Sequence, residues 1–116
     1  MKYNNDFKYD LEVGQVGEKY LGNILQSKKI EVKTDLQAHK TGNIFIEYYS
    51  RGRPSGISKS EADFYAFILS NEKIIIIKTT ELKTICRRYI NTKRDINGGD
   101  SNTSKGILLP IKELLF

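Results

Sequence analysis

The chain has 116 residues, of which 39% are hydrophobic, a formal net charge of +5 and one cysteine. This length predicts a single domain over residues 1–116, and the lack of any long apolar run predicts a soluble protein that does not cross a membrane. One cysteine excludes an internal disulfide framework and a multi-cysteine zinc site. The polar start of the chain lacks the apolar segment of a secretory signal, so we expect a cytoplasmic protein.

The first half of the chain predicts a helix followed by two strands. Over residues 11–27 apolar side chains recur at the three-and-four spacing of an amphipathic helix, and three glycines in this stretch suggest close packing. The apolar residues are Val13, Val16, Tyr20, Leu21, Ile24 and Leu25. Residues 29–38 and 43–50 are rich in Ile, Val, Phe and Tyr, which favours strands.

The second half predicts two strands, a helix and a last strand. Residues 63–69 and 73–79 are the strands, and the second contains four consecutive isoleucines that indicate burial on both faces. Residues 80–91 predict a helix, residues 92–105 a mobile loop, and residues 106–111 a closing strand. The order α-β-β-β-β-α-β is typical of an α/β (α+β) domain with a central mixed sheet flanked by helices.

A hairpin between residues 29–38 and 43–50 is the predicted site of chemistry. If residues 40–42 form a three-residue connection with a left-handed Gly42, Asp35 faces Glu47 and Lys33 faces Tyr49. A two- or four-residue loop would move these partners by one. Facing carboxylates repel each other in a sheet, and a divalent cation is the simplest compensation.

This layout resembles the PD-(D/E)XK nuclease superfamily. Proteins of this superfamily have the restriction-endonuclease-like fold, which small phage and archaeal Holliday-junction resolvases share. Glu18 matches the acid of the family's helix, Asp35 the acid of its next strand, and Glu47-Tyr48-Tyr49 the acidic-x-Lys tripeptide. The chain lacks the proline before Asp35, and Tyr49 stands where the family has lysine. We assign the missing amine to Lys33, because the predicted register places it across from Tyr49.

A second alignment remains open. It takes Glu31-Val32-Lys33 as the tripeptide and Asp10 as the upstream acid, which provides the expected lysine. The amphipathic helix would then lie between the two acids, and the hairpin layout is lost.

The resemblance implies a metal-dependent endonuclease that hydrolyses DNA phosphodiester bonds with a preference for DNA structure. Asp35, Glu47 and the backbone carbonyl of Tyr48 would hold Mg²⁺ or Mn²⁺, with Glu18 assisting directly or through water. Lys33 would orient the attacking water or neutralise the charge that develops at phosphorus.

Two basic clusters are candidate DNA contacts, namely Arg51, Arg53 and Lys59 after the second strand, and Arg87 and Arg88 in the second helix. A domain this small predicts a homodimer or a recruiting protein partner. The alternative function is a non-catalytic nucleic-acid-binding module of the same fold. The bias toward Lys, Ile and Asn suggests an AT-rich genome, such as a viral one.

Overall fold

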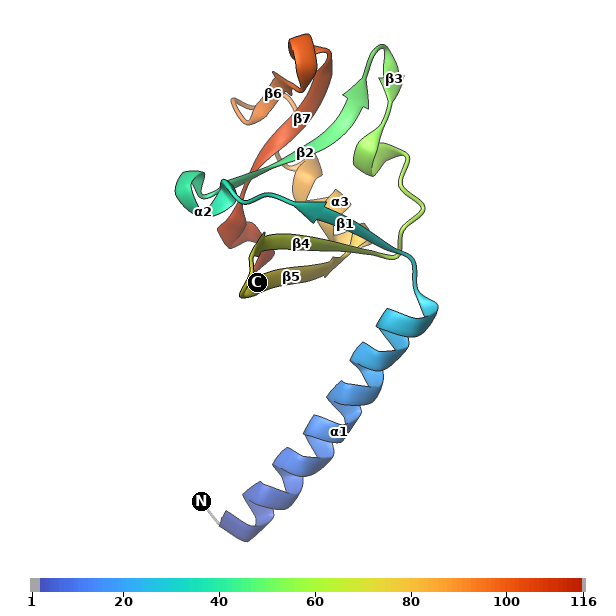
Figure 1. Ribbon diagram of the computed structural model, residues 1–116, viewed down its shortest axis with the longest axis vertical. Coiled ribbons are helices and arrows are strands. Elements are labelled where there is room, and N and C mark those ends of the chain that lie inside the picture. The colour runs from blue at the N-terminus through green and yellow to red at the C-terminus, as the bar shows by residue number, and fades with distance from the viewer. Residues whose placement is uncertain (1–2, 116) are drawn as a thin grey trace.

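The computed structural model describes residues 3–115, with the backbone alone for residues 3–10 and 100. Its strands form two sheets (Figure 1). In the first, β4 (Phe64–Ser70) lies between β1 (Ile30–Thr34), to which it is parallel, and β5 (Lys73–Lys78), to which it is antiparallel. The second is antiparallel, in the order β3 (Arg53–Pro54), β2 (Asn43–Ser50), β7 (Ser104–Pro110) and β6 (Asp95–Gly98).

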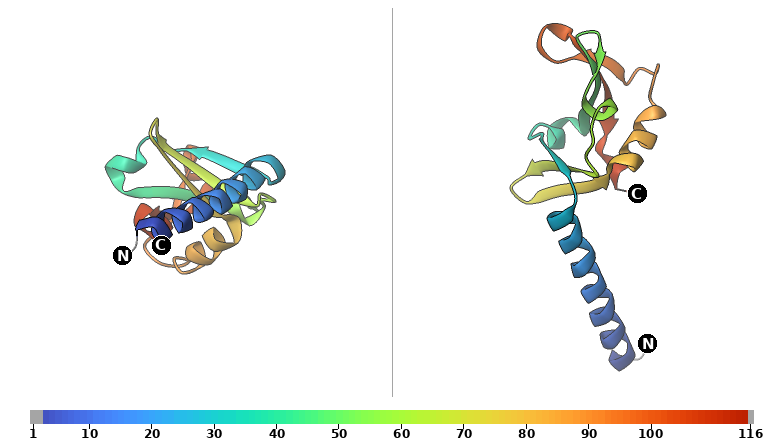
Figure 2. Two further views of the ribbon diagram at one scale, coloured as in Figure 1. Left: turned by 90° about the horizontal axis from the view of Figure 1, so that it is seen from below. Right: turned by 90° about the vertical axis from the view of Figure 1, so that its right-hand side faces the viewer.

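Helical segments connect and flank these sheets. They are α1 (Tyr3–Ser27), α2 (Ala38–Thr41), α3 (Thr79–Arg87) and the 3-10 turns η1 (Gly56–Ser58), η2 (Asp100–Asn102) and η3 (Ile111–Leu114). α1 projects away from the sheets as an isolated rod (Figures 1 and 2), which gives the molecule extents of 59 × 30 × 27 Å. Among the residues described, no helix is both long and apolar enough to cross a membrane.

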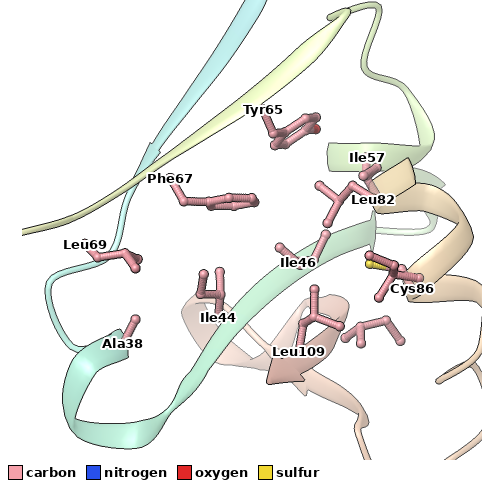
Figure 3. Close-up of a cluster of buried hydrophobic side chains, with 12 residues drawn as sticks. Ala38, Ile44, Ile46, Ile57, Tyr65, Phe67, Leu69, Leu82, Cys86 and Leu109 are labelled. Carbon is pink, nitrogen blue, oxygen red and sulfur yellow. The ribbon is translucent and has the colours of Figure 1, made fainter. Parts of the chain in front are cut away.

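The hydrophobic core lies between the two sheets (Figure 3). Ile44 and Ile46 of β2 face Tyr65 and Phe67 of β4, because alternate residues of each strand point to the same side. α3 closes one side of the core with Leu82, Ile85 and Cys86. Phe67, Leu82, Ile107 and Leu109 are the largest side chains that are fully buried.

The mixed α/β class, the first helix and the strand at residues 43–50 agree with prediction. The single central sheet does not, because the strands divide into two sheets. The strand predicted at residues 29–38 ends at Thr34, and Ala38 begins the short helix α2. The predicted hairpin is therefore wrong: β1 and β2 lie in different sheets, and Gly42, with φ +74°, ends α2.

Four further expectations need correction. β5 is buried on one face only, since Ile74 and Ile76 are 60% and 39% exposed. The predicted loop at residues 92–105 contains β6, which pairs with β7 and thereby satisfies its backbone. The second helix ends at Arg87. Turns closed by backbone hydrogen bonds between residues three positions apart follow it as far as Thr92. The glycines of α1 are not close-packed, since a Cβ at Gly14, Gly17 or Gly22 would meet nothing within 4 Å.

Candidate functional site: a hollow between the two sheets

A hollow of about 260 Å³ lies between β1 and β2 and brings together three predicted site residues, Lys33, Asp35 and Glu47. Its walls come from both sheets and from η1. The other lining residues are Thr34, Ile44, Phe45, Ile46, Gly56, Ile57, Tyr65 and Phe67. We call this feature the inter-sheet hollow. It combines two carboxylates and one amine with an apolar and aromatic wall, a composition common in ligand sites.

Asp35 lies at the end of β1, where the chain leaves the sheet. Its backbone N–H donates to the carbonyl of Ile68 at 2.9 Å, which continues the β1–β4 ladder by one residue. Its Oδ1 accepts a hydrogen bond of 3.0 Å from the N–H of Gln37, an Asx-type turn that leads into α2. Within the described residues the second carboxylate oxygen has no hydrogen bond, so it is available to a ligand.

Glu47 is fixed by the loop that follows β2. The Ser55 hydroxyl donates to Glu47 Oε2 at 2.9 Å, and the Ser55 N–H donates to the carbonyl of Tyr48 at 3.0 Å. Gly56 packs so tightly on this point that a Cβ there would overlap the carbonyl oxygen of Glu47. The β2–β7 register also shifts between Glu47 and Tyr49, and such a bulge re-aims the adjacent side chains. Glu47 is therefore held in place, and Oε1 has no hydrogen bond within the described residues.

Lys33 reaches the hollow from the first sheet. It pairs with Phe67 in the β1–β4 register, so the two side chains project on the same side of the sheet, toward β2. The prediction that Lys33 faces Tyr49 across a hairpin is wrong, because Tyr49 pairs with Pro54 on β3 and Lys105 on β7. Asp35 likewise does not face Glu47 in a ladder. The three residues share a cavity because the two sheets pack on each other.

The structure does not bring Glu18 to this site. It is exposed on α1 and lines a separate surface depression with Glu12, Gln15 and Lys19. Among the side chains that the structure describes, no group of three or more His, Cys, Asp or Glu is arranged to hold a metal ion. The acidic donors of the hollow are thus the two carboxylates, and a role for Glu18 stays a prediction.

Tyr48, whose carbonyl was the third predicted metal ligand, does not line the hollow. Its carbonyl accepts the Ser55 N–H, and its hydroxyl donates to Asp95 Oδ1 at 2.6 Å. Burial, followed by the hydrogen bond and the negative charge of Asp95, raises the pKa of Tyr48 to about 12. Burial opposes ionisation of Asp95, but hydrogen bonds from the Asn91 N–H and Tyr48 and the charge of Lys105 lower its pKa overall. The pair links β2 to β6.

The predicted DNA contacts divide into two groups. Arg51, Arg53 and Lys59 are exposed on the same loop that carries Ser55 and Gly56, and so lie near the hollow along the chain. In the second cluster, Arg87 borders a separate hollow of about 280 Å³ shared with Tyr48, Ile57 and Lys83.

Arg88 has a partner within the protein, since its Nη1 lies 3.7 Å from Glu113 Oε2. This ion pair, together with the 2.7 Å hydrogen bond from Tyr89 to Glu113, ties the end of α3 to η3. The contact favours a structural role for Arg88 over a DNA contact.

Ser55 is the site residue that sequence reasoning missed. A serine in a basic, glycine-containing loop carries no signal of its own, and its role follows from the folding of η1 onto β2. Tyr65, a buried residue of β4, also lines the hollow. Burial is the main reason that the pKa of Tyr65 is raised, so it is a neutral hydrogen-bonding group at pH 7.

The two carboxylates fit a hard divalent cation. Mg²⁺ and Mn²⁺ bind oxygen donors, and Mg²⁺ in particular is commonly held by one or two carboxylates, with water and substrate phosphate completing its coordination. Comparison of the chain with protein-family models, with curated proteins and with solved structures finds no match.

Proposed function

We propose that the protein is a metal-dependent DNA endonuclease of restriction-endonuclease-like fold, with its active site in the inter-sheet hollow. The observation that carries the proposal is that Lys33, Asp35 and Glu47 line one cavity although they come from different sheets. Two carboxylates and one amine beside a basic loop match what phosphodiester hydrolysis requires, namely cation binding, charge neutralisation and phosphate contacts.

Asp35 and Glu47 would hold the cation through the carboxylate oxygens that make no hydrogen bond in the protein. Ser55 keeps Glu47 in one orientation, which lowers the cost of ordering it when the cation binds. When bound, Mg²⁺ or Mn²⁺ would supply Lewis-acid polarisation of the phosphodiester and a lower pKa for water. Lys33 places a positive charge at the rim of the hollow, where it would balance the charge of the scissile phosphate.

The exposed arginines of the loop would hold neighbouring phosphates. Arg51 has φ +50° and is followed by Gly52 with φ +78°, so the chain makes a tight reversal between β2 and β3, and Arg51 and Arg53 are both exposed there. Phosphate contacts of this kind position a duplex without reading its sequence, which agrees with a preference for DNA structure.

The test is cleavage of labelled single-stranded, duplex, flap and junction DNA in Mg²⁺ and Mn²⁺. Asp35→Asn and Glu47→Gln keep the shape of each side chain but remove its charge, and each should reduce cleavage by more than the roughly 10- to 100-fold typical of losing an outer-shell partner. Calorimetric titration with Mn²⁺ should show weaker binding in both variants. Full Mn²⁺-dependent activity in both would overturn the site assignment.

Glu31→Gln is the matched control, since Glu31 lies on the same strand but does not line the hollow. It is also the acid of the second alignment, so retained activity in Glu31→Gln supports the hollow, and lost activity supports Glu31-Val32-Lys33. Lys33→Met should slow cleavage by about 100- to 1,000-fold with little change in Mn²⁺ affinity.

A non-catalytic nucleic-acid-binding module is the second candidate. It is favoured by the absence of a three-acid metal group among the side chains that the structure describes, and by the position of Glu18, which lines a separate depression on α1. DNA binding that weakens with salt, with no cleavage in either metal, would support this module. For both candidate functions, each arginine that contacts a phosphate should contribute about one unit to the slope of log binding constant against log salt concentration.

A further inference from the structure

The projecting helix α1 carries an apolar stripe with no packing partner among the side chains that the structure describes. Its side chains are between 46% and 68% exposed, although they recur at the spacing of a buried helix face. They are Leu11, Val13, Val16, Tyr20, Leu21 and Leu25. Gly14 and Gly17 lie on the same side of the helix and face open space. Glycine lowers helix stability, so a helix with this composition needs a packing partner to persist.

The first sheet has an equally unpartnered face. Val32, Ala66 and Ile76 are aligned across β1, β4 and β5 on the side of the sheet away from β2, where Ala66 on the central strand is itself only 7% exposed. Val32 is 53% exposed and Ile76 is 39% exposed, while Ile74 on the edge strand is 60% exposed. We call this surface the outer face. Adjacent exposed apolar residues of this kind mark a contact surface in a soluble protein.

The α1 stripe and the outer face meet at one end and diverge from there. Ile24, in the last turn of α1, is only 5% exposed. From that point an open groove of about 470 Å³ runs between them, with Tyr20 and Leu21 on the helix side and Phe64 and Ile76 on the sheet side. The groove thus has apolar residues on both walls.

Hydrogen bonds tie the chain to the first sheet directly after α1. The Lys29 N–H donates to Asp63 Oδ2 at 3.0 Å, and the Lys29 carbonyl accepts from the N–H groups of Asp63 and Phe64 at 2.8 and 3.2 Å. The Lys28 N–H still bonds to the Ile24 carbonyl at 3.2 Å. The connection between helix and sheet is therefore short and bonded at both ends, and a second molecule can enter the open groove without changing it.

We propose that the occupant is α1 of a second copy of this chain, in a two-fold dimer where each helix lies in the partner's groove. The dimensions agree, because residues 11–25 of a helix span about 22 Å and the seven residues of β4 about 23 Å. Two-fold symmetry gives two helix–sheet contacts and one helix–helix contact. If each of these three contacts is about 22 Å long and about 10 Å wide, the width of a helix, they bury roughly 1,300 Å² when both surfaces of every contact are counted. This area is within the range of specific interfaces.

This proposal names the partner expected of so small a domain, and it does not depend on nuclease activity, since its measurement is molar mass. Sedimentation equilibrium of the full chain should give twice 13.3 kDa, the mass of one chain. Val16→Glu places a charge on the helix stripe, and Ile74→Glu places one on the outer face. Each variant should sediment as a monomer. Its sheet content, measured by circular dichroism, should be unchanged, because both substituted side chains are at least 60% exposed.

The matched control is Gln26→Glu, which adds the same charge on the exposed side of α1 that carries Lys19, Gly22 and Asn23 and should leave the dimer intact. A mixture of Val16→Glu and Ile74→Glu chains should form a heterodimer, since one of its two helix–sheet contacts contains neither substitution. Three results would each overturn the proposal: a wild-type monomer at about 100 µM, an Ile74→Glu variant that stays fully dimeric, or a mixture that remains monomeric. The second would show that the helices pair with each other alone.

Discussion

Replacement of Gly56 by alanine should destabilise the protein far more than replacement of Gly52, although both glycines have positive φ. Gly56 has φ +50°, and a Cβ there would overlap the Glu47 carbonyl oxygen and lie 2.8 Å from the carbonyl carbon. Gly52 has φ +78°, and a Cβ there would meet nothing within 4 Å. The two variants share the backbone strain and differ in the steric conflict.

The expected losses follow from these two contributions. A left-handed conformation costs an alanine about 1–2 kcal/mol, which applies to both positions. The overlap with backbone atoms adds the cost of local overpacking, about 1–3 kcal/mol, at Gly56 alone. The lower entropy of the unfolded alanine chain offsets some of the loss equally in both variants. We therefore expect about 2–5 kcal/mol of lost unfolding free energy for Gly56→Ala and about 1–2 kcal/mol for Gly52→Ala.

Urea unfolding followed by circular dichroism measures both losses. The dependence of the free energy on urea should stay unchanged in each variant, because neither substitution alters the surface exposed on unfolding. In the Gly56→Ala variant η1 must move from β2, so the Ser55–Glu47 hydrogen bond should weaken with it. Equal losses in the two variants would refute the close contact between η1 and β2 on which the geometry of the hollow depends.

Three further results are expected. Ser55→Ala should reduce Mn²⁺-dependent cleavage or Mn²⁺ affinity by about 10- to 100-fold, while Ser55→Thr, which keeps the hydroxyl, should retain both. Unchanged cleavage and affinity in Ser55→Ala would mean that Glu47 is positioned without the Ser55 hydroxyl. Burial raises the pKa of the Cys86 thiol from 9.0 to about 12, so the native state keeps a proton that the unfolded chain loses as pH rises above 9. Between pH 8 and pH 10 the free energy of unfolding, measured with urea, should therefore fall by about 1.4 kcal/mol more in the wild type than in Cys86→Ala. An identical pH dependence of the two proteins would contradict the burial of this thiol. Tyr48→Phe should lower the free energy of unfolding by about 1.5 kcal/mol near pH 7, because it removes the hydrogen bond to ionised Asp95. This loss should shrink in acid, where the Asp95 carboxylate becomes protonated at a pH below its ordinary pKa. A constant loss from pH 7 to pH 2 would show that the charge of Asp95 is not involved.

The sequence by itself determined the elements whose pattern is local. The three-and-four spacing over residues 11–27 predicted α1, and alternation with β-branched and aromatic residues predicted β2, β4 and β5 within about one residue. These signals depend on side chains a few positions apart, so they survive without knowledge of the fold. Asp35, Glu47 and Lys33 became candidates for one site through a family resemblance and a hairpin register that the structure contradicts.

The partners of the strands were decided by tertiary structure alone. β1 pairs with β4 across 34 residues of sequence, as Ile30 with Phe64, and β2 pairs with β7 across more than 50, as Ser50 with Ser104. Alternation identifies a strand but not its neighbour, and Gly42 suits a helix end as well as a hairpin. β6 has the sequence DING, with no apolar pattern, and is a strand because β7 lies beside it.

The same limit explains the inter-sheet hollow and the groove beside α1. Asp35 and Glu47 line one cavity because β1 and β2 belong to sheets that pack on each other, a contact that no spacing along the chain encodes. The apolar spacing of α1 showed that the helix needs a partner surface. Only the tertiary structure shows that the chain is tied to the start of β4 at Lys29, directly after the helix, and that the apolar side chains of α1 and of the outer face are both exposed.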